Sequence, residues 1–374
     1  MSTAPPAVAD LLAAAVAALG GSPRPGQLTM TEAVARAFDD GEHLAVQAGT
    51  GTGKSLAYLV PAVLRAVTDD TPVVVSTATI ALQRQLVNRD LPRLAEALTP
   101  LLARPPRFAL LKGRRNYLCL NKIHNGATDD EVPQEQLFDP AAATVLGRDV
   151  QRLTAWAETT DTGDRDDLRP GVPDRSWSQV SVSARECLGA VRCPLAADCF
   201  AERARALAGG ADVVVTNHAL LAIDAIGEIA VLPDHRLLVV DEAHELVDRV
   251  TAVATGELTA STLAAATRRI GRLVDRDRVD RLEAASVTFG AALHDGVPGR
   301  IDHLDDELAT HLTVLRDAAA AARAAVDPTK SDAKAAAARA EAVAALTEIT
   351  DTAARILASF APALPDRTDR SEEH

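Results

Sequence analysis

The chain has 374 residues, of which 47% are hydrophobic and 24% charged, so it is long enough for two or three domains with cores of their own. Its net charge of −13 excludes a protein coated with basic surface, although it leaves room for a local basic groove that binds nucleic acid. No run of 18 apolar residues occurs, so we expect no membrane span and a cytoplasmic protein.

Apolar segments of helical and extended character alternate along the first part of the chain. Residues 7–19 predict an amphipathic packing helix, and helices are also predicted at 54–67 and 78–88. Buried strands are predicted at 43–48, 73–77, 108–112, 211–216 and 237–241. Continuous apolar strands that alternate with helices are typical of a parallel sheet covered on both faces, so the fold class is α/β.

The rest of the chain differs in character. A long insert between the third and fourth predicted strands holds every cysteine, and its polar, acidic stretch at 159–174 predicts a loop. Residues 257–362 show helical patterning, with breaks at 296–299 and 327–329, and predict three or four long helices.

A glycine-rich motif lies between the first predicted strand and the helix at 54–67. It reads Ala48-Gly49-Thr50-Gly51-Thr52-Gly53-Lys54-Ser55, which is a P-loop with alanine in place of the first glycine. Its glycines let backbone N–H groups face phosphates, Lys54 reaches the β- and γ-phosphates, and the Ser55 hydroxyl ligates Mg²⁺. A chance glycine-rich turn is the alternative, and it leaves the flanking strand and helix unexplained.

The last predicted strand supplies the acidic partner that a P-loop needs. It ends in Asp241-Glu242-Ala243-His244. We expect Asp241 to hold Mg²⁺ and Glu242 to orient and deprotonate the attacking water. An acidic turn between a strand and a helix is the alternative interpretation.

Together, the P-loop and the Asp-Glu-Ala-His string resemble the motifs of superfamily 2 helicases. The resemblance implies that Gln27 in Arg24-Pro25-Gly26-Gln27 reads adenine, so that the nucleotide is ATP, and that His244 belongs to the nucleotide site. It also implies that residues 76–83 contact single-stranded DNA through Thr77, Thr79 and Gln83. A plain turn is the alternative at Gln27. For residues 76–83 an N-capped helix is the other interpretation, and it is compatible with DNA contact.

Four cysteines form a second constellation: Cys119, Cys187, Cys193 and Cys199. Thiolates bind zinc or iron–sulfur clusters, but structural zinc sites use shorter spacings than the five residues that separate the last three cysteines. The spacing favours a [4Fe–4S] cluster, while a zinc site and unliganded cysteines stay open.

Further segments resemble the XPD/DinG-type helicases, and the chain is identified as a DinG-like member. These segments are residues 112–119, which lead into Cys119, and residues 211–221, which precede the Asp-Glu-Ala-His strand. The resemblance implies that the four cysteines ligate [4Fe–4S]. Arg114 and Arg115, beside the first of these ligands, are expected to contact phosphates, and a solvated basic pair is the alternative. The resemblance also implies a RecA-like lobe in two parts, 1–112 and 200–250, an iron–sulfur insert at 113–199, and an arch-like helical region at 251–374.

The family implies a motor that moves 5′ to 3′ on single-stranded DNA, unwinds duplex at single-strand/double-strand junctions and serves DNA repair. Such motors have a second RecA-like lobe with an arginine finger, and residues 251–374 show no such pattern. We therefore expect an N-terminal portion that binds ATP–Mg²⁺, hydrolyses it poorly alone and needs a second lobe, which a separate chain could carry. A non-catalytic DNA-binding module or split-motor subunit, and a zinc-stabilised NTPase that acts on something other than DNA, are the competing hypotheses.

Overall fold

The structure, a computed structural model, describes residues 6–22, 24–49, 51–125, 140–227, 230–326 and 333–361. These residues form two compact units. The first unit is drawn from 1–120, 133–181 and 195–255, and the second from 121–132, 182–194 and 256–374.

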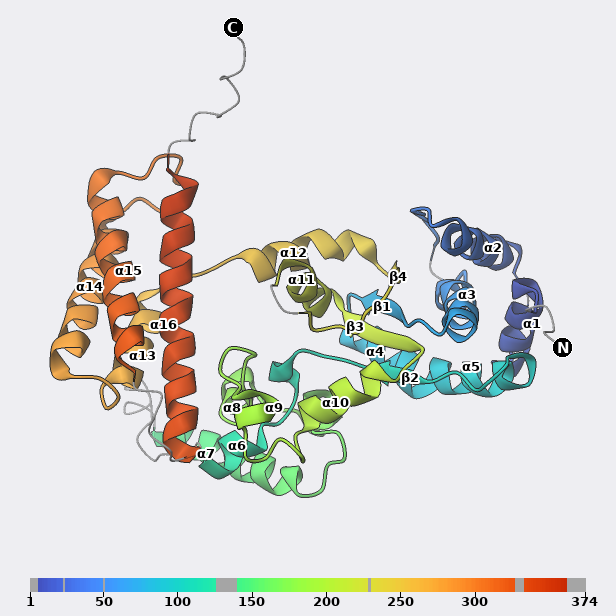
Figure 1. The fold of residues 1–374 in the computed structure, drawn as a ribbon, viewed down its shortest axis with the longest axis horizontal. Coiled ribbons are helices and arrows are strands. Elements are labelled where there is room, and N and C mark those ends of the chain that lie inside the picture. Colours follow the sequence, from blue (N-terminus) through green and yellow to red (C-terminus); the bar gives the residue numbers. More distant parts are fainter. Residues whose placement is uncertain are drawn as a thin grey trace, which may run out of the picture. The chain divides into compact units, whose positions relative to one another are not determined.

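A four-stranded parallel sheet forms the centre of the first unit (Figure 1). Its strands are β1 (Val73–Thr77), β2 (Phe108–Leu110), β3 (Val213–Asn217) and β4 (Leu237–Val240), in the spatial order β2-β3-β1-β4. Ser76 lies opposite Thr216 in β3 and opposite Val240 in β4, so the carboxyl ends of these three strands lie at one edge of the sheet. The prediction of a parallel α/β sheet is confirmed.

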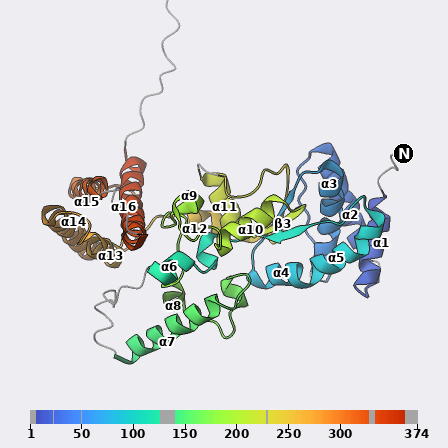
Figure 2. The ribbon, with the colours of Figure 1, turned by 60° about the horizontal axis from the view of Figure 1, so that its bottom comes forward.

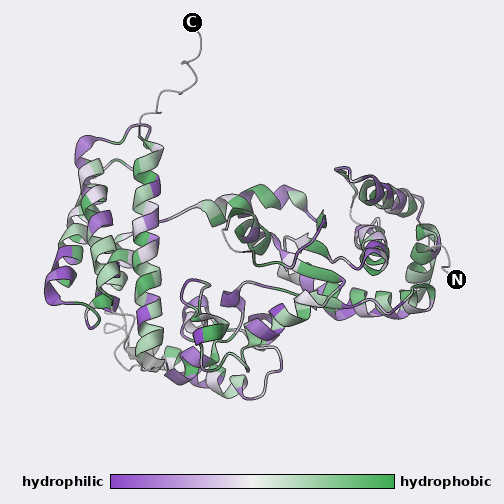
Figure 3. Cartoon of the chain, viewed as in Figure 1, coloured by the Kyte–Doolittle hydropathy of each residue, from purple (hydrophilic) through white to green (hydrophobic). Residues whose placement is uncertain are grey.

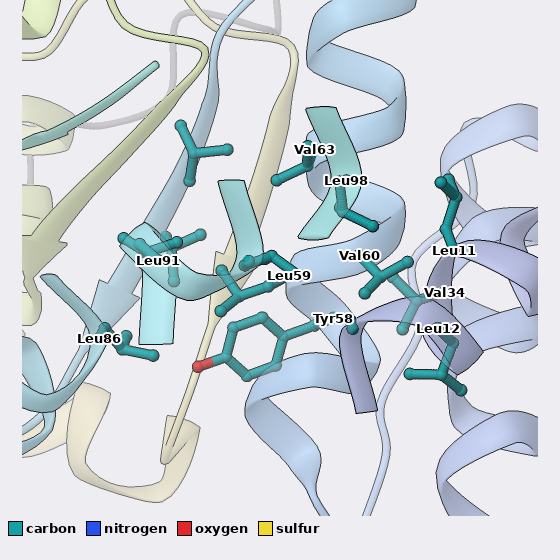
Figure 4. Packing of buried hydrophobic residues seen from close by; sticks show 14 of the residues in the cluster. Leu11, Leu12, Val34, Tyr58, Leu59, Val60, Val63, Leu86, Leu91 and Leu98 are labelled. Carbon is teal, nitrogen blue, oxygen red and sulfur yellow. The ribbon is translucent and has the colours of Figure 1, made fainter. Parts of the chain in front are cut away.

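Helices pack against both faces of this sheet. Alternate β1 residues divide between two cores, because successive side chains in a strand point to opposite faces. Val75 packs in the larger core with α1 (Val8–Ala18), α3 (Lys54–Asp69) and α5 (Leu91–Leu98). Figure 4 shows part of this core, where the Tyr58 ring lies among leucine and valine side chains.

On the other face Val74 packs with residues of two other helices. These helices are α10 (Phe200–Gly209) and α11 (His218–Ile226). The remaining helices outside the insert in the first unit are α2 (Pro25–Asp40), α4 (Ile80–Gln85), which a π-helical turn at Leu86–Asp90 joins to α5, and α12 (Leu246–Ala254).

The helices of the insert between β2 and β3 range from four to 18 residues in length. They are α6 (Leu120–Asn125), α7 (Pro140–Ala157), α8 (Asp174–Ser178) and α9 (Gly189–Arg192), followed by α10. Lys112, which follows β2, donates to Asp164 at 2.5 Å and to Asp166 at 2.7 Å, and its ammonium is almost fully buried. This buried ion pair fixes part of the insert to the end of the sheet.

Four long helices make up most of the second unit: α13 (Ala260–Ile270), α14 (Arg276–Asp295), α15 (Asp306–Ala325) and α16 (Ala333–Ser359). Thr259, Asp275 and Asp305 cap the first three through their side-chain oxygens. Figure 2 shows the four helices side by side, and Figure 3 shows hydrophobic and hydrophilic residues alternating along them. Leucine and alanine side chains form their shared core.

Most of the predicted elements are present, with two differences. Residues 43–48 form no strand, and Leu44 and Val46 are exposed. The apolar run between His43 and Gln47 is only three residues long, and so short a run is compatible with either a buried strand or an extended connection. The helix predicted at 78–88 begins at Ile80, because Thr79 caps it. The break predicted at 327–329 lies outside the described residues. No helix in the described part of the chain is long and apolar enough to cross a membrane.

Candidate functional site

The predicted P-loop leads directly into α3. Gly51 and Gly53 have φ values of +81° and +82°, a left-handed conformation that side chains other than glycine adopt at a cost. The Thr52 hydroxyl donates to the Gly49 carbonyl at 2.8 Å and closes the loop. Ala48 precedes this turn, and Thr50 lies outside the described residues.

Gln27 contacts the P-loop itself. Its side chain is buried, and its Nε2 donates to the Gly53 carbonyl at 3.0 Å. A Cβ atom at Gly53 would lie 2.2 Å from that nitrogen, so only glycine allows this approach. The contact leaves Oε1 of Gln27 as the acceptor for other groups.

Lys54 and Glu242 form an ion pair across the site. Nζ of Lys54 lies 2.9 Å from Oε1 of Glu242, and the two side chains are 27% and 36% exposed. The hydrogen bond from Lys54 lowers the pKa of Glu242, and the same bond raises the pKa of Lys54 against the opposing effect of burial. The P-loop ammonium and the predicted catalytic carboxylate are therefore both charged and in contact.

Asp241 is buried beside them. Its Oδ2 accepts from the Tyr58 hydroxyl at 2.9 Å, and its Oδ1 accepts from the Glu242 N–H at 3.0 Å. Burial first, and the Asp241 charge second, raise the pKa of Tyr58 well above its ordinary value. Ser55 also lies close enough to Tyr58 to affect that pKa, so both predicted Mg²⁺ ligands are neighbours of one tyrosine.

His244 lies on the outside of this site. Its ring is 72% exposed, and Nδ1 lies 3.6 Å from Oε2 of Glu242. Its part in nucleotide binding stays a prediction.

The segment predicted to contact DNA follows β1. Thr79 caps α4 by accepting from the Leu82 N–H at 3.2 Å, so the N-cap interpretation is correct. Thr77 and Gln83 are buried, and neither the Thr77 hydroxyl nor the Gln83 amide has a hydrogen-bond partner in the described part of the protein. Buried polar atoms without partners are uncommon and call for an explanation.

The two predicted phosphate contacts beside Cys119 differ. Arg114 is largely buried and forms an ion pair with Glu202 of α10. Arg115 is exposed, and its carbonyl accepts from Nε1 of Trp177 at 2.6 Å. Of the two, Arg115 has the more accessible side chain.

None of the four cysteines forms a disulfide within the described residues, and all four are half-buried. Cys119 and Cys199 belong to the first unit, and Cys187 and Cys193 to the second. The Gly189 N–H donates to Sγ of Cys187 at 3.4 Å. Among the described residues no group of three or more His, Cys, Asp or Glu side chains is arranged to hold a metal ion.

Two contributors to the site were missed in the sequence. Tyr58 follows Lys54 by four residues and Ser55 by three, which places all three on one face of α3, and this spacing was the available signal. His218 is almost fully buried and lies 2.7 Å from the Ser76 hydroxyl. Nothing in its local sequence predicts that contact, which depends on the pairing of β1 with β3.

Comparison with known proteins agrees with these motifs. Residues 25–101 match the model of the DEAD/DEAH box helicase family. The chain is 72% identical over 366 residues to the ATP-dependent helicase DinG of Mycobacterium tuberculosis (strain H37Rv), a match that covers 97% of this chain and 55% of that protein.

Two further matches are weaker. The ATP-dependent DNA helicase YoaA of Escherichia coli (strain K12) is 39% identical over 237 residues, which covers 61% of this chain and 34% of that protein. A solved structure titled truncated XPD aligns with a TM-score of 0.40 and 14% identity over 83% of this chain and 80% of that one, and no conclusion depends on it. The chain spans about half the length of the curated DinG proteins it matches, and over 97% of its own length its sequence is similar to these helicases.

Proposed function

We propose that the first unit is the nucleotide-binding part of an ATP-dependent DNA helicase. The observation that carries the proposal is the contact between Lys54 of the P-loop and Glu242 of the Asp-Glu-Ala-His turn, with Asp241 buried beside them. It joins a phosphate-binding loop to an acidic pair. Such a pair suits Mg²⁺ binding and the activation of a water molecule.

Each residue has a distinct role in this proposal. Ser55 and Asp241 hold Mg²⁺, and Tyr58 keeps the Asp241 carboxylate in place. Lys54 binds the phosphates, which requires it to leave Glu242. The ion pair between them is partly exposed and contributes about 0–1 kcal/mol, so phosphate oxygens can replace the carboxylate at little cost. Glu242, once released, orients the attacking water.

The DNA side of the proposal comes from relatives such as YoaA of Escherichia coli, which is named an ATP-dependent DNA helicase. We propose that the complete protein moves 5′ to 3′ on single-stranded DNA and unwinds duplex at its junctions with single strand, in the cytoplasm. Thr77, Thr79, Gln83 and Arg115 are the proposed contacts to phosphates. The acidic total charge confines DNA binding to a limited basic surface, so we expect strong salt dependence.

We also propose that Cys119, Cys187, Cys193 and Cys199 bind a [4Fe–4S] cluster. The chemistry of the donor set suits such a cluster, because four half-buried cysteine side chains stand outside disulfides in the described part of the chain, and because the Gly189 N–H donates to Sγ of Cys187. Hydrogen bonds to cluster sulfurs are among the features that set the reduction potential of such sites. The cluster would fix the cysteine segments as a rigid element at the DNA junction.

The nucleotide proposal is tested with three variants of this chain. Lys54→Ala should lose MgATP binding, whereas Glu242→Gln should bind about fivefold more tightly, because it frees Lys54 from an ion pair worth up to about 1 kcal/mol. Glu245→Gln is the matched control, since Glu245 faces His244 and not Lys54. Calorimetric titration measures all three affinities.

Weaker binding by Glu242→Gln than by the parent chain would contradict the exchange of partners by Lys54. MgATP binding without any DNA-stimulated hydrolysis would favour a non-catalytic ATP- and DNA-binding module, or a split-motor subunit.

The cluster proposal is tested by iron and sulfide analysis after anaerobic purification. The parent chain and the control Ala190→Ser should be brown and contain iron and sulfide in equal amounts, and Cys193→Ser should lose them. A colourless protein that contains zinc would exclude the cluster and favour the zinc alternative.

A further inference from the structure

A buried polar cluster lies where β1, β3 and β4 end. Ser76 of β1 and His218, the first residue of α11 after β3, are both almost fully buried, and Oγ of Ser76 lies 2.7 Å from Nδ1 of His218. The Ser76 carbonyl accepts from the Asp241 N–H at 2.9 Å. Ser76 therefore contacts the Asp-Glu-Ala-His turn through its backbone and His218 through its side chain.

The second nitrogen of His218 has no hydrogen-bond partner in the described part of the chain, although the ring is 1% exposed. Burial lowers the pKa of His218, and the nearby backbone of Glu242 and Asp241 opposes that decrease without forming a hydrogen bond to Nε2. A buried donor or acceptor left without a partner costs about 1–3 kcal/mol. Nε2 of His218 thus lacks one hydrogen bond, and the nearby backbone belongs to the Asp241–Glu242 turn.

The turn itself is strained. Glu242 has a φ of +55° and a ψ of +47°, a left-handed conformation that costs a residue other than glycine about 1–2 kcal/mol. The carboxylate of the same residue pairs with Lys54. When Lys54 turns to the phosphates of ATP, that attachment is removed, and the backbone of the turn is free to relax.

We propose that His218 is a positioning residue that couples the nucleotide site to the DNA-contacting segment 76–83, by donating from Nε2 to a carbonyl of the relaxed Asp241–Glu242 turn. This inference depends on the proposed function, because it requires that the chain bind both ATP and DNA. The Nε2–H tautomer leaves Nδ1 as an acceptor, so the Ser76 hydroxyl donates to it. A movement of the turn is then transmitted through the ring to Ser76.

The segment beyond Ser76 can respond to such a movement. The Thr77 hydroxyl and both polar atoms of the Gln83 amide are buried without partners in the described structure, as is Nε2 of His218. The unused hydrogen-bonding capacity of Thr77 and Gln83, in the segment that follows Ser76, and of His218, beside Ser76, would be better satisfied in a second arrangement. DNA phosphates and the relaxed turn supply the missing partners in that arrangement.

The experiment measures coupling and not binding alone. The affinity of the chain for a fluorescent oligo-dT is determined with and without a slowly hydrolysed ATP analogue plus Mg²⁺, and the ratio of the two dissociation constants is the coupling factor. We expect a factor of about 5 or more for the parent chain. We expect it to fall to nearly 1 for His218→Asn and Ser76→Ala.

Three comparisons separate positioning from a general structural role. In His218→Gln the amide reaches the place of Nε2 and should restore part of the coupling, whereas the shorter amide of His218→Asn reaches only Ser76. Thr216→Val is the matched control, because that buried hydroxyl donates to the Leu111 carbonyl at the other neighbour of β3. Its coupling factor should equal that of the parent chain. Circular dichroism confirms that each variant is folded.

Two results would overturn the inference while the proposed function stands: a parent chain that binds both ligands with a coupling factor of 1, or variants at His218 that keep the parent factor. A parent chain that binds no MgATP or no DNA refutes the proposed function, and the coupling role of His218 with it.

Discussion

At the scale of single residues, Gly53 is the position where the Gln27 side chain packs against the backbone of the P-loop. It has a positive φ, and it faces the Gln27 amide so closely that a methyl group has no room. The P-loop pattern was readable from the sequence, because all its residues are local. The contact with Gln27 was not, because it joins α2 to the start of α3 and exists only after the two helices pack.

Gly53→Ala should therefore lower the free energy of unfolding by more than the strain of a left-handed alanine alone. We expect a loss of about 2–4 kcal/mol in the free energy of unfolding, from left-handed strain and the displaced Gln27 side chain together, and a loss of MgATP affinity. Gly41→Ala is the control, since Gly41 has a φ of +68° and open space around it, and should lose only about 1–2 kcal/mol. Urea unfolding measures both, and equal losses would contradict the role of Gln27.

Tyr58 gives a prediction about alkaline pH. Its folded-state pKa is raised well above its ordinary value, so the folded chain keeps a proton that the unfolded chain loses above about pH 10. The free energy of unfolding therefore falls as pH rises beyond that point. Tyr58→Phe should be about 1–2 kcal/mol less stable at pH 7, because Asp241 loses a hydrogen bond, and should show a smaller decrease between pH 9 and 11.

Urea unfolding at stepped pH checks this. Tyr117, the other tyrosine, also has a raised pKa, so the comparison of variant with parent isolates Tyr58. An identical alkaline decrease in both proteins would show that Tyr58 is not held neutral by its surroundings.

At the scale of elements, continuous apolar runs predicted four of the five strands, since burial on both faces leaves little choice of residue. The fifth, at 43–48, failed because a run with two exposed hydrophobic side chains carries no such constraint. The helices of the second unit were predicted from a different signal, the helical patterning of residues 257–362 and the breaks within it. The charged contacts between elements were not predicted, because they link positions far apart in the chain.

One of these contacts fixes the start of β3. Asp212 is buried, accepts two hydrogen bonds from Arg104 at 2.7 Å, and accepts a third from the Arg107 N–H. Burial by itself would raise the pKa of Asp212, but these donors outweigh it and lower the pKa. The stabilisation is therefore complete above about pH 4 and is lost as the pH falls through the lowered pKa.

Asp212→Ala should lower the free energy of unfolding at pH 7 by about 2–3 kcal/mol, because it removes a buried acceptor of charge-assisted hydrogen bonds. Asp70→Ala removes the exposed partner of the same arginine and should cost less than about 1 kcal/mol, most of it because alanine tolerates the φ of +51° at this position less well than aspartate. The difference between the two variants should shrink below pH 4. A large loss for Asp70→Ala would show that Arg104, and not Asp212, organises the contact.

At the scale of the whole molecule, the nucleotide site and the helical bundle belong to different compact units. Both tryptophans, Trp156 and Trp177, lie in the first unit, so their fluorescence reports that unit alone. The four long helices of the second unit contribute strongly to the helical circular dichroism signal. The two probes therefore follow different parts of one chain.

MgATP binds the folded site and not the unfolded chain, so it should stabilise the first unit selectively. At 100 times its dissociation constant it adds about 2.7 kcal/mol, which moves the urea transition seen by tryptophan fluorescence to higher concentration. The part of the dichroism signal that comes from the second unit should stay in place, and Lys54→Ala should abolish the shift. If MgATP shifts the urea transitions seen by both probes by the same amount, the two units unfold as one cooperative block, and binding at the P-loop then stabilises both units.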